Sequence, residues 1–158
     1  MQHANLVGKY DLSIDEKHRL LIPSEVRREL KPERDGQAFY VVVGENGKAW
    51  LYTELYFDGL ASQMRQTILP GQDRLAFDQW FFSNARKLEC DKQGRVLIPE
   101  STLKRTGTSR QVSLIGCRDH LEIWNRADWE AHDIALSARM QEILQRARES
   151  MAAERAGN

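Results

Sequence analysis

The feature that most constrains this chain is a nine-residue phrase that occurs twice. Residues 15–23 read Asp-Glu-Lys-His-Arg-Leu-Leu-Ile-Pro, and residues 91–99 read Asp-Lys-Gln-Gly-Arg-Val-Leu-Ile-Pro. The Asp, Arg and Pro keep one spacing, because 91−15, 95−19 and 99−23 all equal 76. The match continues at an offset of 72, after a four-residue deletion, from 41–44 and 50–52 to 113–116 and 122–124. Such a repeat predicts one small supersecondary unit that was duplicated, so that its function is performed twice in related orientations.

The composition is that of a globular chain that can bury a sizeable core. The sequence has 158 residues, of which 41% are apolar and 29% are charged, within the ordinary range for globular domains. No apolar run approaches the roughly 20 residues needed to cross a bilayer. Residues 1–10 lack the basic-then-apolar order of a signal peptide. We therefore expect a cytoplasmic protein that makes no membrane contact.

The residues that usually carry chemistry give no sign of an enzyme. The sequence has no His-x-x-x-His, Cys-x-x-Cys, Gly-rich phosphate loop or Ser nucleophile motif. The four histidines fall in different expected elements, and the Asp119–His120 pair carries no weight alone. For Cys90 and Cys117, reduced thiols acting as small buried hydrophobes are favoured over a redox pair or half of a shared metal site. We expect no catalytic residue, no metal and no cofactor.

The formal net charge is zero, which argues against DNA binding through bulk charge alone. The distribution of charge is uneven, however, because basic residues outnumber acidic ones by seven to three in residues 84–111. The matching stretch of the first copy is balanced. These basic residues are Arg86, Lys87, Lys92, Arg95, Lys104, Arg105 and Arg110. The sequence thus predicts a weakly basic face around the second motif.

Each copy is expected to begin with a strand and a turn. Residues 9–14 alternate apolar and polar side chains, as in a half-buried strand, and residues 88–90 repeat this pattern. The Asp-x-x-x-Arg segment then turns the chain. A short apolar strand leads back to Pro23 or Pro99, where it ends because proline cannot donate to a central ladder. A short helix follows in the first copy, with Ser24 as the candidate N-cap.

A hairpin and then helices complete each copy. A turn at Gly44–Gly47 joins residues 39–43 to residues 48–52, and a turn at Cys117–His120 takes that place after residues 111–115. Helical spacing covers residues 54–66, ended by Pro70-Gly71, and residues 74–83. Residues 126–151 are expected to form one long helix, with an apolar stripe at Ile134, Leu136, Ala138, Met140, Ile143 and Leu144. Its two possible roles, packing within the chain and contact between subunits, stay open.

These elements divide the chain into four parts. Residues 6–53 form the first repeat, 54–83 the connecting helices, 84–127 the second repeat, and 128–158 a C-terminal helix with a frayed tail. A unit of four strands is too small to close alone, so we expect the two copies to interleave in one barrel.

The Asp and Arg of each motif have a structural and a functional interpretation. Asp15 and Asp91 can accept backbone N–H groups within the turn, while the arginine pairs with them. The arginine is retained while the residues between Asp and Arg differ. A guanidinium on a hairpin rim offers a planar fork that suits phosphate oxygens or the O6/N7 edge of guanine. We therefore predict that Arg19 and Arg95 are exposed on neighbouring hairpin tips, where they contact nucleic acid.

At this point the chain resembles a known family. The doubled D-x-x-x-R-x-L-I-P, each copy followed by an apolar strand and a Gly, then by Leu-Tyr52 or Ile-Trp124 and an aromatic residue five positions on, is similar to the MraZ family. The five-on aromatics are Phe57 and Trp129. The family consists of bacterial transcriptional regulators of the division and cell-wall gene cluster, built from two AbrB-like (SpoVT-AbrB) half-units. The resemblance runs from about Leu6 to Trp129.

The resemblance implies a mainly β fold with α (α+β), a swapped-hairpin (double-split) β-barrel of two AbrB-like repeats with peripheral helices. It implies a nucleoid-associated repressor that binds double-stranded promoter repeats as a ring-shaped homo-oligomer. The DNA-binding residues would be Arg19 and Arg95, with Lys17 and Lys92 beside them. Asp15, Asp91 and Gly94 would be structural turn residues.

The first copy departs from the family phrase at one position. The family favours Gly before the arginine, as at Gly94, but the first copy has His18. If this position needs a positive φ, Gly is the least strained residue and His is among the tolerated alternatives.

The alternative function is an AbrB-like oligomeric scaffold or protein-partner module, in which the motif is purely structural.

Overall fold

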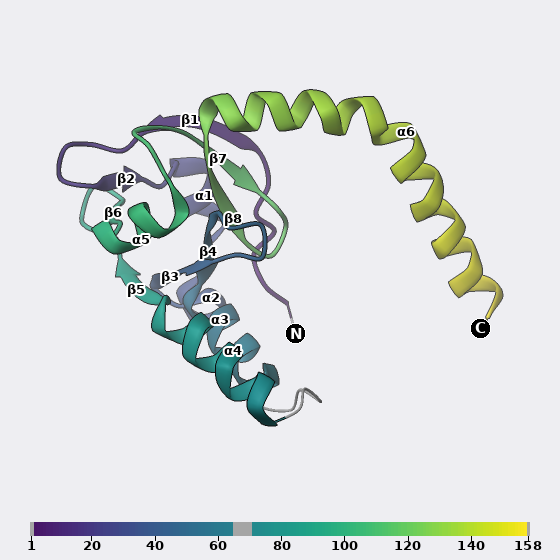
Figure 1. The fold of residues 1–158 in the computed structure, drawn as a ribbon, viewed down its shortest axis with the longest axis horizontal. Helices are drawn as coiled ribbons and strands as arrows, with labels where there is room; N and C mark the ends of the chain where they lie inside the picture. The colour runs from purple at the N-terminus through teal and green to yellow at the C-terminus, as the bar shows by residue number, and fades with distance from the viewer. Residues whose placement is uncertain (1, 65–70, 158) are drawn as a thin grey trace. The chain divides into compact units, whose positions relative to one another are not determined.

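The computed structural model describes residues 2–64 and 71–157, which form an α+β fold with an antiparallel sheet (Figure 1). The chain divides into a unit of residues Met1–Asn125 and a unit of residues Arg126–Asn158. The expected helix break at Pro70 lies outside the described residues, and Gly71 is the first residue of a helix.

The elements follow the order expected from the duplication, apart from a short helix at residues 32–35 that was not predicted and has no counterpart in the second copy. The first copy contains β1 (Lys9–Ser13), β2 (Arg19–Leu21), α1 (Ser24–Glu29), α2 (Pro32–Asp35), β3 (Ala38–Val43) and β4 (Ala49–Thr53). Two helices follow, α3 (Glu54–Met64) and α4 (Gly71–Ser83). The second copy contains β5 (Arg86–Glu89), β6 (Arg95–Leu97), α5 (Glu100–Thr106), β7 (Gln111–Gly116) and β8 (Leu121–Asn125), and α6 (Arg126–Ala156) ends the chain.

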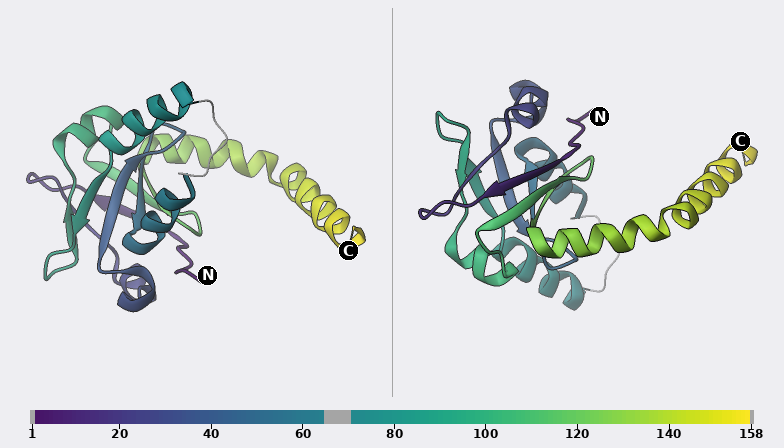
Figure 2. Two further views of the ribbon diagram at one scale, coloured as in Figure 1. Left: turned by 90° about the horizontal axis from the view of Figure 1, so that it is seen from below. Right: turned by 90° about the horizontal axis from the view of Figure 1, so that it is seen from above.

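The two copies exchange strands. A six-stranded sheet has the order β1-β7-β8-β4-β3-β5, and β2 pairs with β6 in a separate two-stranded ribbon. The first strand of each copy therefore pairs with the hairpin of the other copy, β1 with β7 and β5 with β3. The right-hand view of Figure 2 shows the purple β1 along the green β7. Neither copy could form this sheet without the other.

The strand registers reveal a pseudo-twofold axis. Leu20 lies opposite Val96 at the centre of the β2–β6 ribbon, and Trp50 lies opposite Glu122 where β4 pairs with β8. Both pairs join equivalent positions of the repeat, since 96−20 is 76 and 122−50 is 72. The axis that relates the two copies therefore passes between both pairs.

Alternate residues of the central β3–β4 hairpin face two separate cores. Phe39, Val41, Ala49 and Leu51 belong to the main core, which also receives Leu20, Ile22, Val96 and Ile98 from the ribbon side. The other face of the hairpin contributes to an aromatic cluster with Phe57 of α3 and Phe81 of α4. The side chains on this face are those of Tyr40, Val42, Trp50 and Tyr52. The ribbon and these helices thus lie on opposite faces of the sheet, and the two-sided burial explains the long apolar run of β3.

Several local expectations from the sequence are wrong. Ser24 is not an N-cap, because Pro23 takes that position and no side-chain cap hydrogen bond is formed in α1. The segment expected to fray continues as helix to Ala156, since Ala, Arg and Glu all favour helix. Within α6 apolar side chains do not gather on one face, and none of its described side chains is buried. Among the described residues, no helix is both long and apolar enough to cross a membrane.

Candidate nucleic-acid interface

The first Asp–Arg turn is organised by one carboxylate. Asp15 Oδ1 accepts the backbone N–H groups of Lys17 and Arg19, both at 2.9 Å. Asp15 Oδ2 accepts the side-chain Nε–H of Arg19 at 2.7 Å. The backbone closes the turn as well, because His18 N–H donates to the Asp15 carbonyl at 3.0 Å. The short carboxylate side chain thus fixes the backbone and one edge of the guanidinium together.

The second turn repeats this arrangement. Asp91 Oδ1 accepts the N–H groups of Gln93 at 2.8 Å and Arg95 at 3.0 Å, and Asp91 Oδ2 accepts Arg95 Nε–H at 3.1 Å. In both turns the backbone N–H of the arginine, together with its side chain, holds the pKa of the aspartate below its ordinary value of 3.8. Both carboxylates are therefore ionised at neutral pH.

Each guanidinium is oriented by its aspartate and leaves its outer edge available. The Arg19 and Arg95 side chains are 32% and 29% exposed, so they are half-buried rather than fully exposed as the sequence suggested. In the described part of the chain, the recorded hydrogen bonds of these guanidinium groups come from Nε. The two Nη groups of each arginine thus remain able to donate as a planar fork.

The β2–β6 ribbon places both arginines on one face. Arg19 lies opposite Leu97 and Leu21 lies opposite Arg95, so these four side chains project from the same side of the ribbon. Leu20 between them points into the main core and is fully buried. The arginines are therefore at opposite ends of one antiparallel ribbon, across the pseudo-twofold axis, and not on neighbouring hairpin tips.

Two exposed leucines complete this face and were missed from the sequence. Leu21 is 42% exposed and Leu97 is 59% exposed, although both lie in apolar runs that read as core strands. Their exposure could have been predicted from the alternation of side chains along a strand, because the middle residue of Leu20-Leu21-Ile22 must face away from its neighbours. We call Arg19, Leu21, Arg95 and Leu97 the ribbon face.

The two turns differ in what covers them. His18 and Gly94 both have positive φ, 63° and 84°. A Cβ at Gly94 would lie 2.5 Å from Arg27 Nε, because the Arg27 side chain crosses this turn and donates to the Ile22 carbonyl. Glycine is thus favoured there by the positive φ and by the close approach of Arg27.

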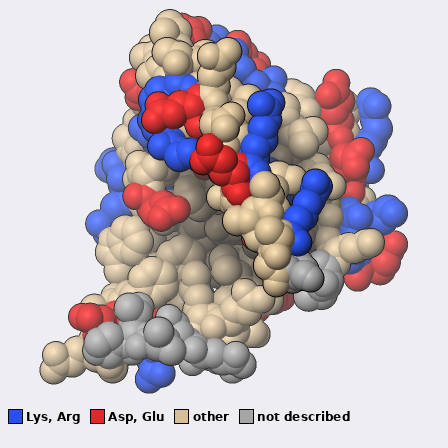
Figure 3. Space-filling model, turned by 90° about the vertical axis from the view of Figure 1, so that its right-hand side faces the viewer, with Lys and Arg blue, Asp and Glu red and all other residues tan. Residues whose placement is uncertain are grey.

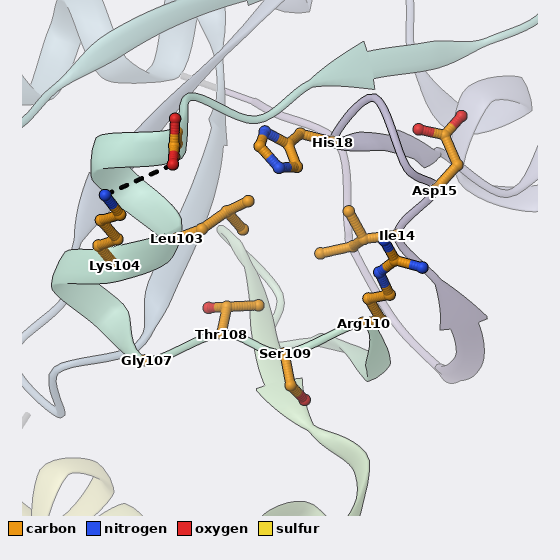
Figure 4. A pocket seen from close by; sticks show the side chains of 10 residues that line it. Ile14, Asp15, His18, Leu103, Lys104, Gly107, Thr108, Ser109 and Arg110 are labelled. Atoms are coloured by element: carbon orange, nitrogen blue, oxygen red, sulfur yellow. Dashed lines mark ion pairs between the residues drawn. The ribbon is translucent and has the colours of Figure 1, made fainter.

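The equivalent of Arg27 in the second copy is Leu103, which leaves room for a side chain at position 18. A cavity of about 310 Å³ lies beside the first turn. Figure 4 shows His18, Leu103 and Ile14 facing it, with Lys104 and Arg110 at its edges. The neighbour across the axis therefore explains why one turn has Gly and the other has His.

The turns that flank the ribbon face carry two lysines. Lys17 and Lys92 occupy the exposed positions after the two aspartates, and both are solvent-exposed. On the face of the molecule drawn in Figure 3, Lys and Arg side chains are interspersed with Asp and Glu. That face carries no single-sign patch, in keeping with a net charge of zero.

Sequence comparisons with known proteins identify relatives of this chain. A family model described as "MraZ protein, putative antitoxin-like" matches residues 81–152. A protein of Clostridium tetani named Transcriptional regulator MraZ is 33% identical over 129 residues, which cover 82% of this chain and 87% of that protein. Proteins with the same name from Acetivibrio thermocellus and Heliobacterium modesticaldum are 32% and 29% identical, covering 79% and 89% of this chain and 84% and 94% of theirs. The chain therefore belongs to the MraZ family.

Proposed function

We propose that this chain is a sequence-specific DNA-binding transcription regulator, and not an enzyme, that reads DNA with the ribbon face. The observation that carries the proposal is the pair of arginines, each held by a hydrogen bond from its Nε atom to Asp15 or Asp91. Holding one edge of a guanidinium reduces the conformational entropy lost when the other edge binds. A fork oriented in this way suits bidentate contact with guanine O6 and N7.

The dimensions of the ribbon favour the major groove. A major groove about 12 Å wide admits a two-stranded β-ribbon, and β-ribbon proteins read bases in this way. The pseudo-twofold relation of Arg19 and Arg95 matches a site with the same base at symmetric positions. Leu21 and Leu97 offer the apolar contact that a thymine methyl group accepts.

Lys17 and Lys92 supply the adjacent backbone contacts in this proposal. Their exposed ammonium groups sit in the same turns as the aspartates, where they neutralise phosphates flanking the bases. Few phosphates are neutralised by one chain, so a single chain binds weakly. Assembly into a ring-shaped homo-oligomer makes later contacts intramolecular and raises avidity by about 10²–10⁴.

The biological setting follows from the family. The regulator acts as a repressor of the division and cell-wall gene cluster at promoter repeats, in the cytoplasm and in association with the nucleoid. The exchanged strands and the ribbon together form the swapped-hairpin barrel. The four parts expected from the sequence, 6–53, 54–83, 84–127 and 128–158, act as two half-units, a connecting pair of helices and a C-terminal helix.

The second candidate function is an oligomeric scaffold, favoured by the internal pairing of each arginine with its own aspartate.

Mobility shifts on DNA that carries the chain's promoter repeats separate the two functions. Replacing Arg19 or Arg95 by Ala should each weaken binding by about 1–3 kcal/mol, the value of a bidentate base contact. Arg28→Ala and Arg110→Ala are the matched controls and should cost less. Intact oligomers that bind no DNA would support the scaffold, and equal losses at all four sites would point to diffuse electrostatics.

The dependence on assembly has its own test. Repeats should be spaced near a helical turn of roughly 10 bp, so that they face one side of the duplex. Affinity is measured against the number of repeats and against a half-turn insertion between them. If one repeat binds as tightly as several, or the insertion changes nothing, the avidity mechanism is wrong.

A further inference from the structure

The turn between β7 and β8 gathers three metal-ligating side chains of different kinds. The ligand atoms of Cys117, His120 and Glu122 all lie within 4.8 Å of one another. His120 Nε2 is 2.8 Å from Glu122 Oε2, and Cys117 Sγ is 3.4 Å from the same oxygen. His120 is buried, and the other two residues are half-buried. This cluster was not predicted from the sequence, because the three residues match no common spacing motif.

We propose that Cys117, His120 and Glu122 bind one Zn²⁺ ion per chain. Bond lengths of about 2.0–2.3 Å to nitrogen, oxygen and sulfur place the corners of a zinc tetrahedron about 3.3–3.6 Å apart. The separations in the cluster, from 2.8 Å up to a limit of 4.8 Å, span these values, so the side chains must shift to seat the ion. A thiolate, an imidazole and a carboxylate together suit zinc better than magnesium or calcium. A fourth ligand, water or a group from another molecule, would complete the tetrahedron.

The histidine is already oriented as a metal ligand. His120 Nδ1 lies 2.6 Å from Asp119 Oδ1, so the carboxylate holds the ring with Nε2 turned toward Cys117 and Glu122. Tyr56 O–H in turn donates to Asp119 Oδ2 at 3.2 Å. The ring also stacks on Trp50, with centroids 4.0 Å apart and planes 18° from parallel. A carboxylate behind a ligating histidine is the usual outer-shell partner of zinc.

The glutamate is fixed in the same way. Its Oε1 accepts hydrogen bonds from Trp124 Nε1–H at 2.9 Å and from Asn46 Nδ2–H at 3.0 Å. Both donors occupy one oxygen and leave Oε2 to face the histidine and the cysteine. Two of the three ligands are therefore held by neighbours that would not themselves touch the metal.

The cluster is separate from the ribbon face, and its three ligands are not repeated in the first copy. Glu122 lies beside the pseudo-twofold axis, but it faces the aromatic-cluster side of the sheet, opposite the ribbon. The positions equivalent to Cys117, His120 and Glu122 in the first copy are Glu45, Lys48 and Trp50. These residues cannot form the same site, which limits the stoichiometry to one ion per chain.

His120 is hydrogen-bonded to two carboxylates in the structure. Burial lowers the pKa of His120, but hydrogen bonds with Cys117, Glu122 and Asp119 outweigh it and raise the pKa to about 10. The imidazolium then donates from Nε2 to Glu122 Oε2. Histidine and cysteine bind zinc in their deprotonated forms, so metal binding at this cluster should depend on pH.

The test uses the full chain, stripped of metal with a chelator and titrated with Co²⁺. A thiolate-to-cobalt charge-transfer band and the visible bands of a four-coordinate ion should grow to one equivalent, and Zn²⁺ should abolish them. Absence of the thiolate band at one equivalent would overturn the proposal.

Matched variants locate the site. Cys117→Ser should remove the charge-transfer band, whereas Cys90→Ser, which changes the other cysteine, should keep it; the reverse result would overturn the assignment. Asp119→Ala removes the positioning residue and should weaken Co²⁺ binding about 10–100-fold while the band at saturation persists. Unchanged affinity in Asp119→Ala would also contradict the proposed geometry. Circular dichroism of each metal-free variant establishes that it is folded before the titration.

Discussion

The two copies of the repeat agree most closely at the Asp–Arg turns and least in the connection that leads from the helix to the hairpin. In the first copy eight residues, 30–37, join α1 to β3 and include helix α2, whereas four residues, 107–110, join α5 to β7. This difference of four residues accounts for the change of offset from 76 to 72. The turns keep their geometry because the ribbon depends on it, while a connection needs only to deliver the chain to the next strand.

The two connections are also held by different chemistry. In the first copy the buried Asp35 carboxylate accepts N–H groups from Ala4 and Lys31 and pairs with Arg34 at 2.8 Å. In the second copy a neutral amide does the equivalent work, because Asn125 accepts Ser109 N–H at 2.7 Å and donates to the Gly107 carbonyl at 2.8 Å. One copy therefore depends on a buried charge and the other does not.

The largest effect that tests this difference is expected at Asp35. Asp35→Ala removes the acceptor of two backbone N–H groups and leaves a half-buried Arg34 without its partner, so the free energy of unfolding should fall by about 3–5 kcal/mol. Asn125→Ala breaks neutral hydrogen bonds and should cost about 1–3 kcal/mol. Urea unfolding of both variants measures the two losses. Equal losses would show that charge is not what distinguishes the connections.

The next effect tests the asymmetry of the turns. Gly94→Ala places a Cβ at φ 84° and 2.5 Å from Arg27 Nε, so it should lower the free energy of unfolding by about 1–3 kcal/mol. His18→Ala, at φ 63°, is the matched control and should change it much less, because a Cβ is already accommodated there. Adding Arg27→Ala to Gly94→Ala should restore part of the loss. If Arg27→Ala restores none of the lost free energy of unfolding, the whole loss comes from the positive φ at position 94.

A third, smaller effect is the acid sensitivity of the first connection. Burial raises the pKa of Asp35, but hydrogen bonds from Arg34, Lys31 and Ala4 outweigh it and hold the pKa below 3.8. The folded chain then binds fewer protons than the unfolded chain. The stabilisation from ionised Asp35 is therefore fully present above the pKa that Asp35 has in the unfolded chain, and it is lost as the pH falls through the pKa of Asp35 in the folded chain. Unfolding free energy measured below about pH 4 should therefore fall with a shallower slope in Asp35→Asn than in the native chain. Asn125→Ala should keep the native slope, and identical slopes in all three proteins would remove Asp35 from the explanation.

The sequence predicted the features that follow from the repeat and from the alternation of side chains along strands. The order of strands and helices, the hairpin turns at Gly44–Gly47 and Cys117–His120, and the alternation in β1 all follow from local pattern. The exchange of strands was expected from the resemblance, but the register that puts Arg19 opposite Leu97 depends on pairing between distant segments. For this reason the arrangement of the two arginines on one ribbon, and the exposure of Leu97, came only from the structure.

The cluster around His120 shows a second limit of sequence reasoning. Asp119-His120 is a pair that occurs often by chance, and Cys117 resembles a small buried hydrophobe. Their grouping depends on the β7–β8 turn and on Trp50 and Asn46, which come from the other copy. Side chains that meet across a strand pairing leave no spacing motif in one sequence.

The smallest effect tests the similarity of the turns rather than their difference. Asp15→Asn and Asp91→Asn keep an Oδ1 acceptor for the two backbone N–H groups but lose the ion pair with arginine Nε. Because both carboxylates are well exposed, solvent screens this pairing, and the thermal unfolding midpoint should fall slightly and by the same amount in both variants. DNA affinity should also weaken equally, since each guanidinium loses the group that orients it. Asp58→Asn, on the exposed side of α3, is the matched control and should change neither quantity. A larger loss of affinity at one turn than at the other would show that the two halves of the ribbon face make unequal contacts with DNA, even though their geometry in the chain is the same.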